Sequence, residues 1–304
     1  MNIKNWFHEK NIFKKPNRWI HNVVFWGVII EIITLGLIIT SMITKTIEGT
    51  WGAAGIWFYS LTFFTQQSNI LVAIFVITFF FKKDAKIFKN SYFLVFVTAY
   101  ITITFIGFNF FLLPGGVAYA LINFTDDPVI HITYNTVISI FTNIFAHEIN
   151  PVFMVSLYIL LVKKTEVRVL KTGKQAWKYV GFGLIYPIIY LTYAAVIPFL
   201  VDFSVYGPFT NLNPNLYWSN EGASNDPNAF TNAMPGKPWY AMFFIIFIGF
   251  FTISLFVYSH VLHSYYSPKR IQRAKEKEQY RDSLLDRRVG ACEEIRGGNG
   301  SCQI

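Results

Sequence analysis

Length and composition place the chain among integral membrane proteins. It has 304 residues, of which 53% are hydrophobic, 19% aromatic and only 14% charged. Soluble domains carry roughly 25% charged residues, so this balance excludes an ordinary soluble protein. The two cysteines, Cys292 and Cys302, both lie in a polar C-terminal tail. They indicate neither a disulfide framework nor a metal site, and we expect no cofactor.

Six apolar segments are long enough to cross a bilayer, whose hydrocarbon core takes roughly 20 helical residues. They run over residues 19–43, 57–81, 93–113, 137–162, 179–200 and 239–262. The first follows a basic segment and lacks a small-residue cleavage site, so we interpret it as a retained span and not as a signal peptide. The two halves show no sequence similarity. The sequence therefore predicts one all-α membrane domain, a bundle of six transmembrane helices.

The distribution of basic residues predicts the orientation of the chain. Of the 26 Lys and Arg residues, 24 precede span one, lie between spans two and three or four and five, or follow span six. The other two are Lys45 and Lys237. Because basic residues favour the cytoplasmic side, we expect both termini in the cytoplasm and the protein in the plasma membrane. The net charge of +9 is then a topology signal, and no nucleic-acid partner is expected.

Three parts follow from this topology. Residues 1–18 form a basic N-terminus, residues 19–263 the membrane domain with a long outer loop at 201–238, and residues 264–304 a charged tail. From Pro268 the tail has helix formers and mixed charge, which is typical of a solvated helix. Its Gly-rich end, residues 290–304, is expected to be disordered.

Polar and ionisable side chains interrupt three of the spans. His147, Glu148 and Asn150 lie in the middle of span four, and Glu31 lies near the middle of span one. Span two has the most polar cluster of any span, residues 62–69 with the sequence TFFTQQSN. Ionisable groups near the midplane are costly and usually face a bundle interior or a wet cavity, where they serve a function. The alternative for His147 is a helix-packing contact in which the imidazole is a satisfied donor.

Thr65 and His147 are expected at matching depth. At a rise of about 1.5 Å per residue, they lie roughly 6 and 4 Å outside the midplanes of their helices. Polar residues recur at helical spacing on one face of each span: Thr62, Thr65 and Asn69 on span two, and Asn143, His147 and Asn150 on span four. We therefore predict that the two stripes face each other, with Glu31 in the same interior cavity.

This arrangement suggests nucleophilic chemistry. A neutral imidazole can take the proton of the Thr65 hydroxyl and activate the oxygen, and Glu31 can orient that imidazole. Glu148 cannot easily do so, because it lies about 100° around the same helix from His147. Gln66 or Asn69 can donate to an oxyanion. The alternative for the threonine is a hydrogen bond to the carbonyl one turn back, which is common in membrane helices and needs no function.

Three short motifs carry a resemblance: FFT at residues 63–65, His147-x-x-x-Pro151, and an aromatic stretch from Tyr186 that leads to YGPF at residues 206–209. They are similar to the nucleophile motif, the histidine followed by proline and the Tyr-Pro-Phe turn of the androgen-induced-protein family. That family consists of six-span intramembrane threonine hydrolases, which cleave fatty acid esters of hydroxy fatty acids, and has uncharacterised bacterial relatives. The resemblance implies that Thr65 is the nucleophile and His147 its base, although Thr62 offers a competing alignment.

The sequence therefore predicts a membrane hydrolase that cleaves a lipid ester, with membrane lipids around it and the ester as its partner. Thr65, His147 and Glu31 are the candidate catalytic residues. The candidates for contacting substrate or an oxyanion are Gln66, Asn69, Asn150 and Tyr190. A proton- or cation-coupled transporter or channel that uses Glu31, His147 and Glu148 is the alternative function, and a non-catalytic structural membrane protein is the third.

Overall fold

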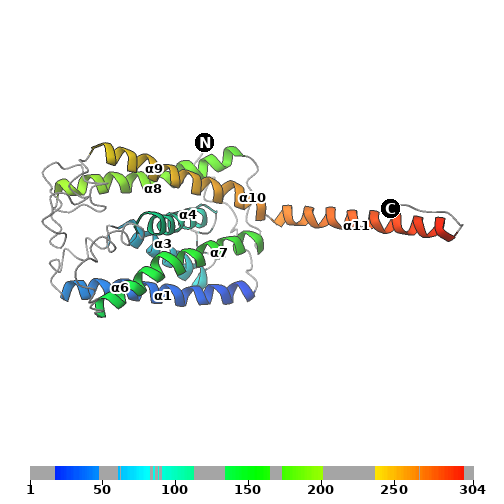
Figure 1. The fold of residues 1–304 in the computed structure, drawn as a ribbon. Coiled ribbons are helices and arrows are strands. Elements are labelled where there is room, and N and C mark those ends of the chain that lie inside the picture. Colours follow the sequence, from blue (N-terminus) through cyan, green and yellow to red (C-terminus); the bar gives the residue numbers. More distant parts are fainter. Residues whose placement is uncertain are drawn as a thin grey trace, which may run out of the picture.

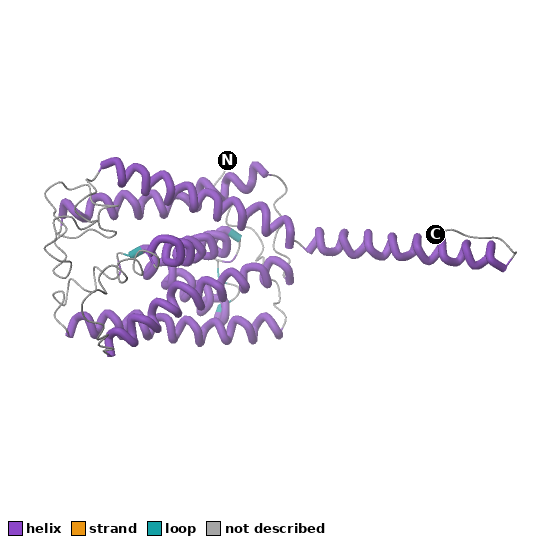
Figure 2. Tube along the Cα trace, in the orientation of Figure 1, coloured by secondary structure: helices purple, strands orange, loops and turns teal. Residues whose placement is uncertain are grey.

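The computed structural model describes residues 18–47, 63–82, 91–112, 134–164, 173–200, 237–266 and 268–297, with single residues 61, 85 and 88 between them. These ranges are almost entirely helical and contain no strand (Figure 2). Within them, six helices are long and apolar enough to cross a membrane, which confirms the predicted all-α class and number of candidate spans.

The helices follow the predicted spans in chain order. They are α1 (Arg18–Ile47), α3 (Phe64–Phe81), α4 (Tyr92–Gly107), α6 (Tyr134–Ile144), α7 (Asn150–Lys164), α8 (Gly173–Leu200), α9 (Lys237–Phe256), α10 (His263–Tyr266) and α11 (Pro268–Gly297). Three π-helical segments extend or join them: η3 (Phe108–Leu112), η4 (Phe145–Ile149) and η6 (Val257–Leu262). In Figure 1, α11 extends away from the bundle, and the side chains described on it are nearly all exposed.

Helix α4 lies at the centre of the bundle. It contacts α3, α7, α8 and α9, and in Figure 1 α3 and α4 run between a layer of α8 and α9 and a layer of α1, α6 and α7. Residues 97–101 are buried in an unbroken run, so every face of this part of the helix is covered by protein. The two polar side chains of this run, Thr98 and Tyr100, need no water, because both donate to backbone carbonyls inside the bundle.

Two glycines allow helices to approach closely. A Cβ atom on Gly27 of α1 would lie 2.2 Å from Cζ of Phe153 on α7, and one on Gly183 of α8 would lie 2.6 Å from Cδ2 of Leu255 on α9. Membrane helices associate largely through such close packing, since lipid tails provide no hydrophobic force between them. These positions therefore fix how α1 meets α7 and how α8 meets α9.

Helix α8 continues through Pro187 because another helix supplies the missing donor. Proline has no N–H group, so the carbonyl of Gly183, four residues earlier, receives no hydrogen bond from its own helix. The Tyr100 hydroxyl of α4 donates to that carbonyl at 2.7 Å. The central helix thus satisfies the backbone of α8 at its proline.

The π-helical turn η4 holds the most polar part of span four. The backbone N–H of Asn150 donates to the Phe145 carbonyl five residues earlier, which is the π-helical pattern. Each extra residue in such a turn rotates the following side chains by about 100° relative to an α-helix, and π turns are frequent at functional sites. This rotation explains why Asn143 is exposed while His147 and Asn150 are buried, contrary to the predicted single stripe.

Of two predicted boundaries, one lies outside the described residues and one differs in the structure. Helix α3 begins at Phe64, after Phe63 with an extended backbone and ψ 133°, while the predicted start of span two near residue 57 lies outside the described residues. Thr62, and with it the expected helical spacing from Thr62 to Thr65, lies outside the described residues. In the tail, the helix predicted from Pro268 is present, but it runs to Gly297, so residues 290–297 are helical and not disordered.

Candidate functional site

Asn69 ties span two to span four. Its side-chain Nδ2 donates to the carbonyl of Thr65 at 2.8 Å and to the carbonyl of Ala146 at 3.2 Å. The Asn69 side chain is fully buried. A single amide nitrogen therefore holds the first turn of α3 against the residue that precedes His147.

Asn150 extends this contact to span one. Its Nδ2 donates to Oδ1 of Asn69 at 2.7 Å and to Oε2 of Glu31 at 3.3 Å. Glu31, Asn69 and Asn150 all have 0% exposed surface. The three side chains form a hydrogen-bonded chain across α1, α7 and α3, which we call the Glu31 chain.

His147 lies on the other side of η4, against α4 and η3. Its ring stacks on Phe108 with centroids 4.1 Å apart and an interplanar angle of 17°. The imidazole also hydrogen-bonds the backbone of Thr104. Its Nδ1 atom is buried and has no partner among the described residues. The contacts with Phe108 and Thr104 agree with a packing role for the ring, while Nδ1 remains able to accept or donate a proton.

Thr65 is the second residue of α3 and is half-buried. Its backbone carbonyl accepts hydrogen bonds from Oγ of Ser68 at 2.9 Å and from Asn69. Ser68 also shares a hydrogen bond of 2.7 Å with the Thr104 hydroxyl, and Thr104 is the residue that the His147 ring contacts. In the part of the chain that is described, no hydrogen bond joins the Thr65 hydroxyl to His147 directly.

Glu31 does not orient His147. Its carboxylate accepts from Asn150, and within the described ranges it makes no hydrogen bond to the imidazole. Glu31, the predicted third member of the triad, therefore contacts Asn150 and not His147. The reason is that the π turn directs His147 and Asn150 toward different helices. His147 faces α4, whereas Asn150 faces α1 and α3.

The predicted oxyanion donors also have other partners. Both hydrogens of the Asn69 amide and both hydrogens of the Asn150 amide are already donated, so neither is available to a substrate without rearrangement. The Tyr190 hydroxyl accepts from the Phe64 N–H at 2.9 Å, which satisfies a donor at the start of α3. Gln66 Oε1 is buried without a partner among the described residues.

The sequence reading missed Asn109, which pairs with Glu148. Nδ2 of Asn109 in η3 donates to Oε1 of Glu148 in η4 at 2.7 Å, and also to the carbonyl of Phe105 at 3.0 Å. A signal was present, because Asn109 is the one amide side chain in span three. The two π turns η3 and η4 therefore meet through an amide–carboxylate contact beside the stacked pair of Phe108 and His147.

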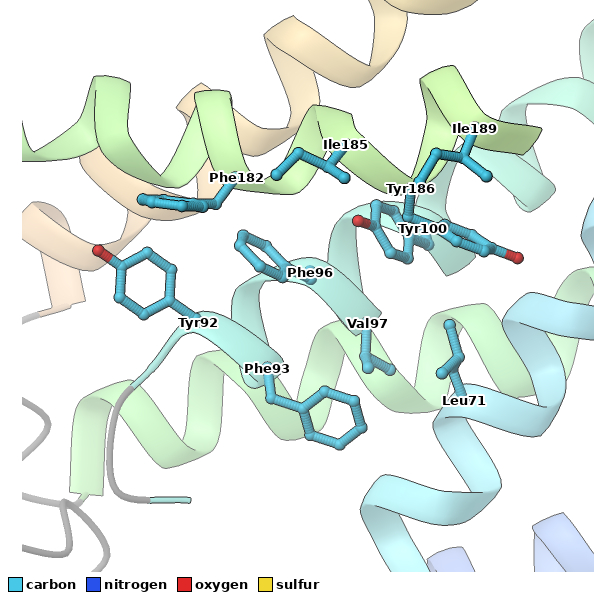
Figure 3. Close-up of a pocket in the computed structure, with 10 residues that line it drawn as sticks. All are labelled: Leu71, Tyr92, Phe93, Phe96, Val97, Tyr100, Phe182, Ile185, Tyr186 and Ile189. Carbon is cyan, nitrogen blue, oxygen red and sulfur yellow. The ribbon is translucent and has the colours of Figure 1, made fainter. Parts of the chain in front are cut away.

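A cavity of about 460 Å³ lies between α3, α4 and α8 (Figure 3). Its walls are aromatic and aliphatic side chains, with Leu71 from α3 and Tyr100 and Tyr186 near one end. The Tyr186 hydroxyl donates to Oε1 of Gln67, two residues from Thr65. Glu31, Thr65 and His147 do not line this cavity, so it is not the shared polar cavity predicted from the sequence.

No metal site is evident in the described part of the chain. No group of three or more His, Cys, Asp or Glu side chains there is placed to hold a metal ion.

Comparison with known proteins finds uncharacterised relatives. A family model described as "Protein of unknown function (DUF1600)" matches residues 140–267, which include His147, Asn150 and Tyr190. The chain is 30% identical over 212 residues to "Uncharacterized protein MG133" of Mycoplasma genitalium, covering 60% of this chain and 76% of that protein. It is 28% identical over 189 residues to "Uncharacterized protein MG452" of the same organism, covering 62% of this chain and 61% of that protein.

A third relative is the "Uncharacterized protein MG452 homolog" of Mycoplasma pneumoniae, 28% identical over 169 residues. That match covers 51% of this chain and 61% of the relative. No solved structure matches the chain.

Proposed function

The chain belongs to the family of the Mycoplasma genitalium protein MG133, and we propose that it is a membrane hydrolase that cleaves a lipid ester through Thr65 and His147. One observation carries the proposal. A buried imidazole lies on a π turn that a single amide, Asn69, holds against the backbone of Thr65, and one of its nitrogens has no partner among the described residues. This is the setting in which a threonine and a histidine from different helices can be brought to act together.

The chemistry needs a base for the threonine. An unassisted hydroxyl is a weak nucleophile, and an imidazole that removes its proton as the bond forms contributes typically about 10²- to 10⁴-fold. Nδ1 of His147 is the atom available for this task. The pair must form on substrate binding by movement of the Thr65 side chain toward η4, since catalytic hydrogen bonds often tighten only in the substrate complex.

The position of Thr65 at the start of α3 supports the same role. The N-terminal end of a helix carries a partial positive charge and unpaired N–H groups, which favour a developing negative charge. Thr65 is the second helical residue, so an oxyanion formed beside it would lie at that end. The N–H groups of Phe64, Gln66 and Gln67 already have acceptors, so the Thr65 N–H replaces the Asn69 and Asn150 amides as the candidate for stabilising the oxyanion.

The apolar cavity between α3, α4 and α8 suits the acyl chain of a lipid ester. Its walls offer almost no polar surface, and several of its α8 residues, such as Phe182 and Ile189, are exposed on the outside of the bundle. An acyl chain could therefore enter sideways from the bilayer. The contact of Tyr186 with Gln67 connects this wall to the turn that bears Thr65.

The finer assignments of membrane and orientation belong to the proposal too. We place the protein in the plasma membrane with both termini in the cytoplasm, on the strength of 24 basic residues on one side and two on the other. On this orientation Thr65 and His147 lie slightly toward the outer face.

The test is activity and labelling of purified protein. Wild type in detergent is screened against a panel of lipid esters and with a phosphonate probe that labels serine and threonine nucleophiles. Thr65→Val, which keeps the shape but removes the hydroxyl, and His147→Gln should abolish both signals, while Thr65→Ser and Thr62→Val should retain them. Normal labelling of a folded Thr65→Val protein would disprove the nucleophile assignment.

A second candidate function is proton-coupled transport, which the full burial of Glu31 favours. Within the described ranges, however, no hydrogen bond joins any two of Glu31, His147 and Glu148, which have separate partners. Reconstituted protein that moves a solute along a proton gradient but neither labels nor hydrolyses any ester would favour this function over the hydrolase.

A further inference from the structure

The orientation of two amides is fixed by their surroundings. Nδ2 of Asn69 faces two backbone carbonyls, those of Thr65 and Ala146, and carbonyl oxygens only accept hydrogen bonds. Asn69 must therefore present its NH₂ group to them and its Oδ1 to Asn150. Asn150 must in turn present its own NH₂ group to Asn69, and its second N–H goes to Oε2 of Glu31.

This orientation leaves two oxygens without donors. Oε1 of Glu31 and Oδ1 of Asn150 are both buried, and neither has a hydrogen-bond partner among the described residues. Both side chains have 0% exposed surface, so bulk water does not satisfy them. Each of these acceptors therefore needs a donor inside the bundle, and the two side chains that carry them are already joined by one hydrogen bond.

We propose that Glu31 and Asn150 form a buried proton-binding site, in which a neutral Glu31 carboxylic acid donates from Oε1 to Oδ1 of Asn150 while Oε2 accepts from Nδ2. One proton, taken from water, satisfies both unpartnered oxygens at once. The result is a cyclic acid–amide pair with two hydrogen bonds. The site does not depend on ester hydrolysis, and it binds a proton whether or not Thr65 is a nucleophile.

Among the described side chains of the elements that pack against α1, no cation lies beside Glu31 to hold it ionised. Helix α1 packs against α3, α6, η4 and α7. No residue of α3 titrates, and on η4 His147 bonds the Thr104 backbone while Glu148 accepts from Asn109. On α7, Tyr158 donates to the Tyr258 carbonyl, and Lys163 is exposed at the far end of the helix. The side chains of Lys164 on α7 and of Tyr134, the one titratable residue of α6, lie outside the described part of the chain.

An ionised Glu31 would be costly in this position. A buried charge without a paired cation or several donors carries a large desolvation penalty. The Asn150 amide supplies one donor to the carboxylate, and its other hydrogen is committed to Asn69. Binding a proton removes the charge and fills the vacant donor position in one step.

Infrared difference spectroscopy of the purified full chain tests the proposal directly. Wild type minus Glu31→Gln at neutral pH should contain the C=O stretch of a carboxylic acid and no carboxylate bands. Wild type minus Glu148→Gln, the matched control, should not contain the band that Glu31→Gln removes. Carboxylate bands in the Glu31→Gln difference would overturn the proposal.

Spectra of wild type alone keep the test independent of whether Glu31→Gln folds. With ¹³C-labelled glutamate, the acid C=O band should be present at neutral pH and vanish at strongly alkaline pH. Its absence at neutral pH would overturn the assignment.

Thermal stability provides a second readout. Glutamine can reproduce both hydrogen bonds of a neutral acid, so Glu31→Gln should melt within about 3 °C of wild type below about pH 4, where glutamate is protonated in the folded and the unfolded state alike. As the pH rises above about 4.3, the ordinary glutamate pKa, wild type should lose stability relative to Glu31→Gln until the folded state also releases its proton, because in that range the folded state holds a proton that the unfolded state does not. If replacing choline with sodium in the buffer raised the Tm of wild type but not of Glu31→Gln, the site would bind a sodium ion and the proposed proton site would be wrong.

Discussion

The Tyr100 hydroxyl donates a hydrogen bond of 2.7 Å to the carbonyl of Gly183, the group that Pro187 deprives of its helical donor. Tyr100 is buried on the central helix α4 and Gly183 is buried on α8. The Tyr100 hydroxyl therefore replaces the hydrogen-bond donor that α8 lacks at Pro187. The same hydrogen bond fixes the position of α4 along α8.

Tyr100→Phe should lower the free energy of unfolding by about 1–3 kcal/mol, because it leaves the buried Gly183 carbonyl without a donor. Denaturant titration in mixed micelles measures the change. Tyr280→Phe on the exposed helix α11 is the matched control and should have no measurable effect. Equal stability of the two variants would mean that water or the backbone satisfies the carbonyl instead.

Gly27→Ala should destabilise the bundle by about 1–3 kcal/mol, since its Cβ would overlap the ring of Phe153 at 2.2 Å. Gly36→Ala on the same helix meets nothing within 4 Å and should be neutral or slightly stabilising. The stability of both variants is measured by thermal melting in detergent. The double variant Gly27→Ala/Phe153→Leu should recover part of the lost stability, because leucine is smaller than phenylalanine. If Gly27→Ala were as stable as Gly36→Ala, the close approach of α1 and α7 would be refuted.

Asn69→Leu should cost about 2 kcal/mol of stability, because it removes three hydrogen bonds that in membrane proteins average about 0.6 kcal/mol each. Asn143→Leu, at an exposed amide, is the control and should leave the melting temperature unchanged. If Thr65 and His147 act together, Asn69→Leu should also reduce any esterase activity more than Asn143→Leu does. Indistinguishable melting of the two variants would show that the Asn69 contacts contribute nothing.

Single cysteines placed at Ser224 and Ser283, in a chain whose two native cysteines are replaced by serine, test the orientation. The charge asymmetry predicts that a membrane-impermeant maleimide labels position 224 in intact cells and position 283 only after permeabilisation. The reverse pattern would place both termini outside.

The class and the number of spans could be predicted from the sequence because both depend on local composition. Runs of roughly 20 apolar residues have few alternatives to a membrane helix, since no other structure satisfies the backbone in lipid within one segment. The solvated helix from Pro268 follows from local propensity in the same way. The polar residues that matter, Glu31, Asn69, His147 and Asn150, could also be found, because each is costly in an apolar run.

What these residues contact was decided only by the tertiary structure. The π turn η4 shifts the phase of span four, so Asn143 turns outward, His147 meets Phe108 and Asn150 meets Glu31. Such a turn depends on the partners that η3, α3 and α1 offer, and a helical periodicity read from the sequence assumes that it is absent. The identity of residues in a membrane helix fixes which groups need partners, but which partner each receives depends on how the helices pack.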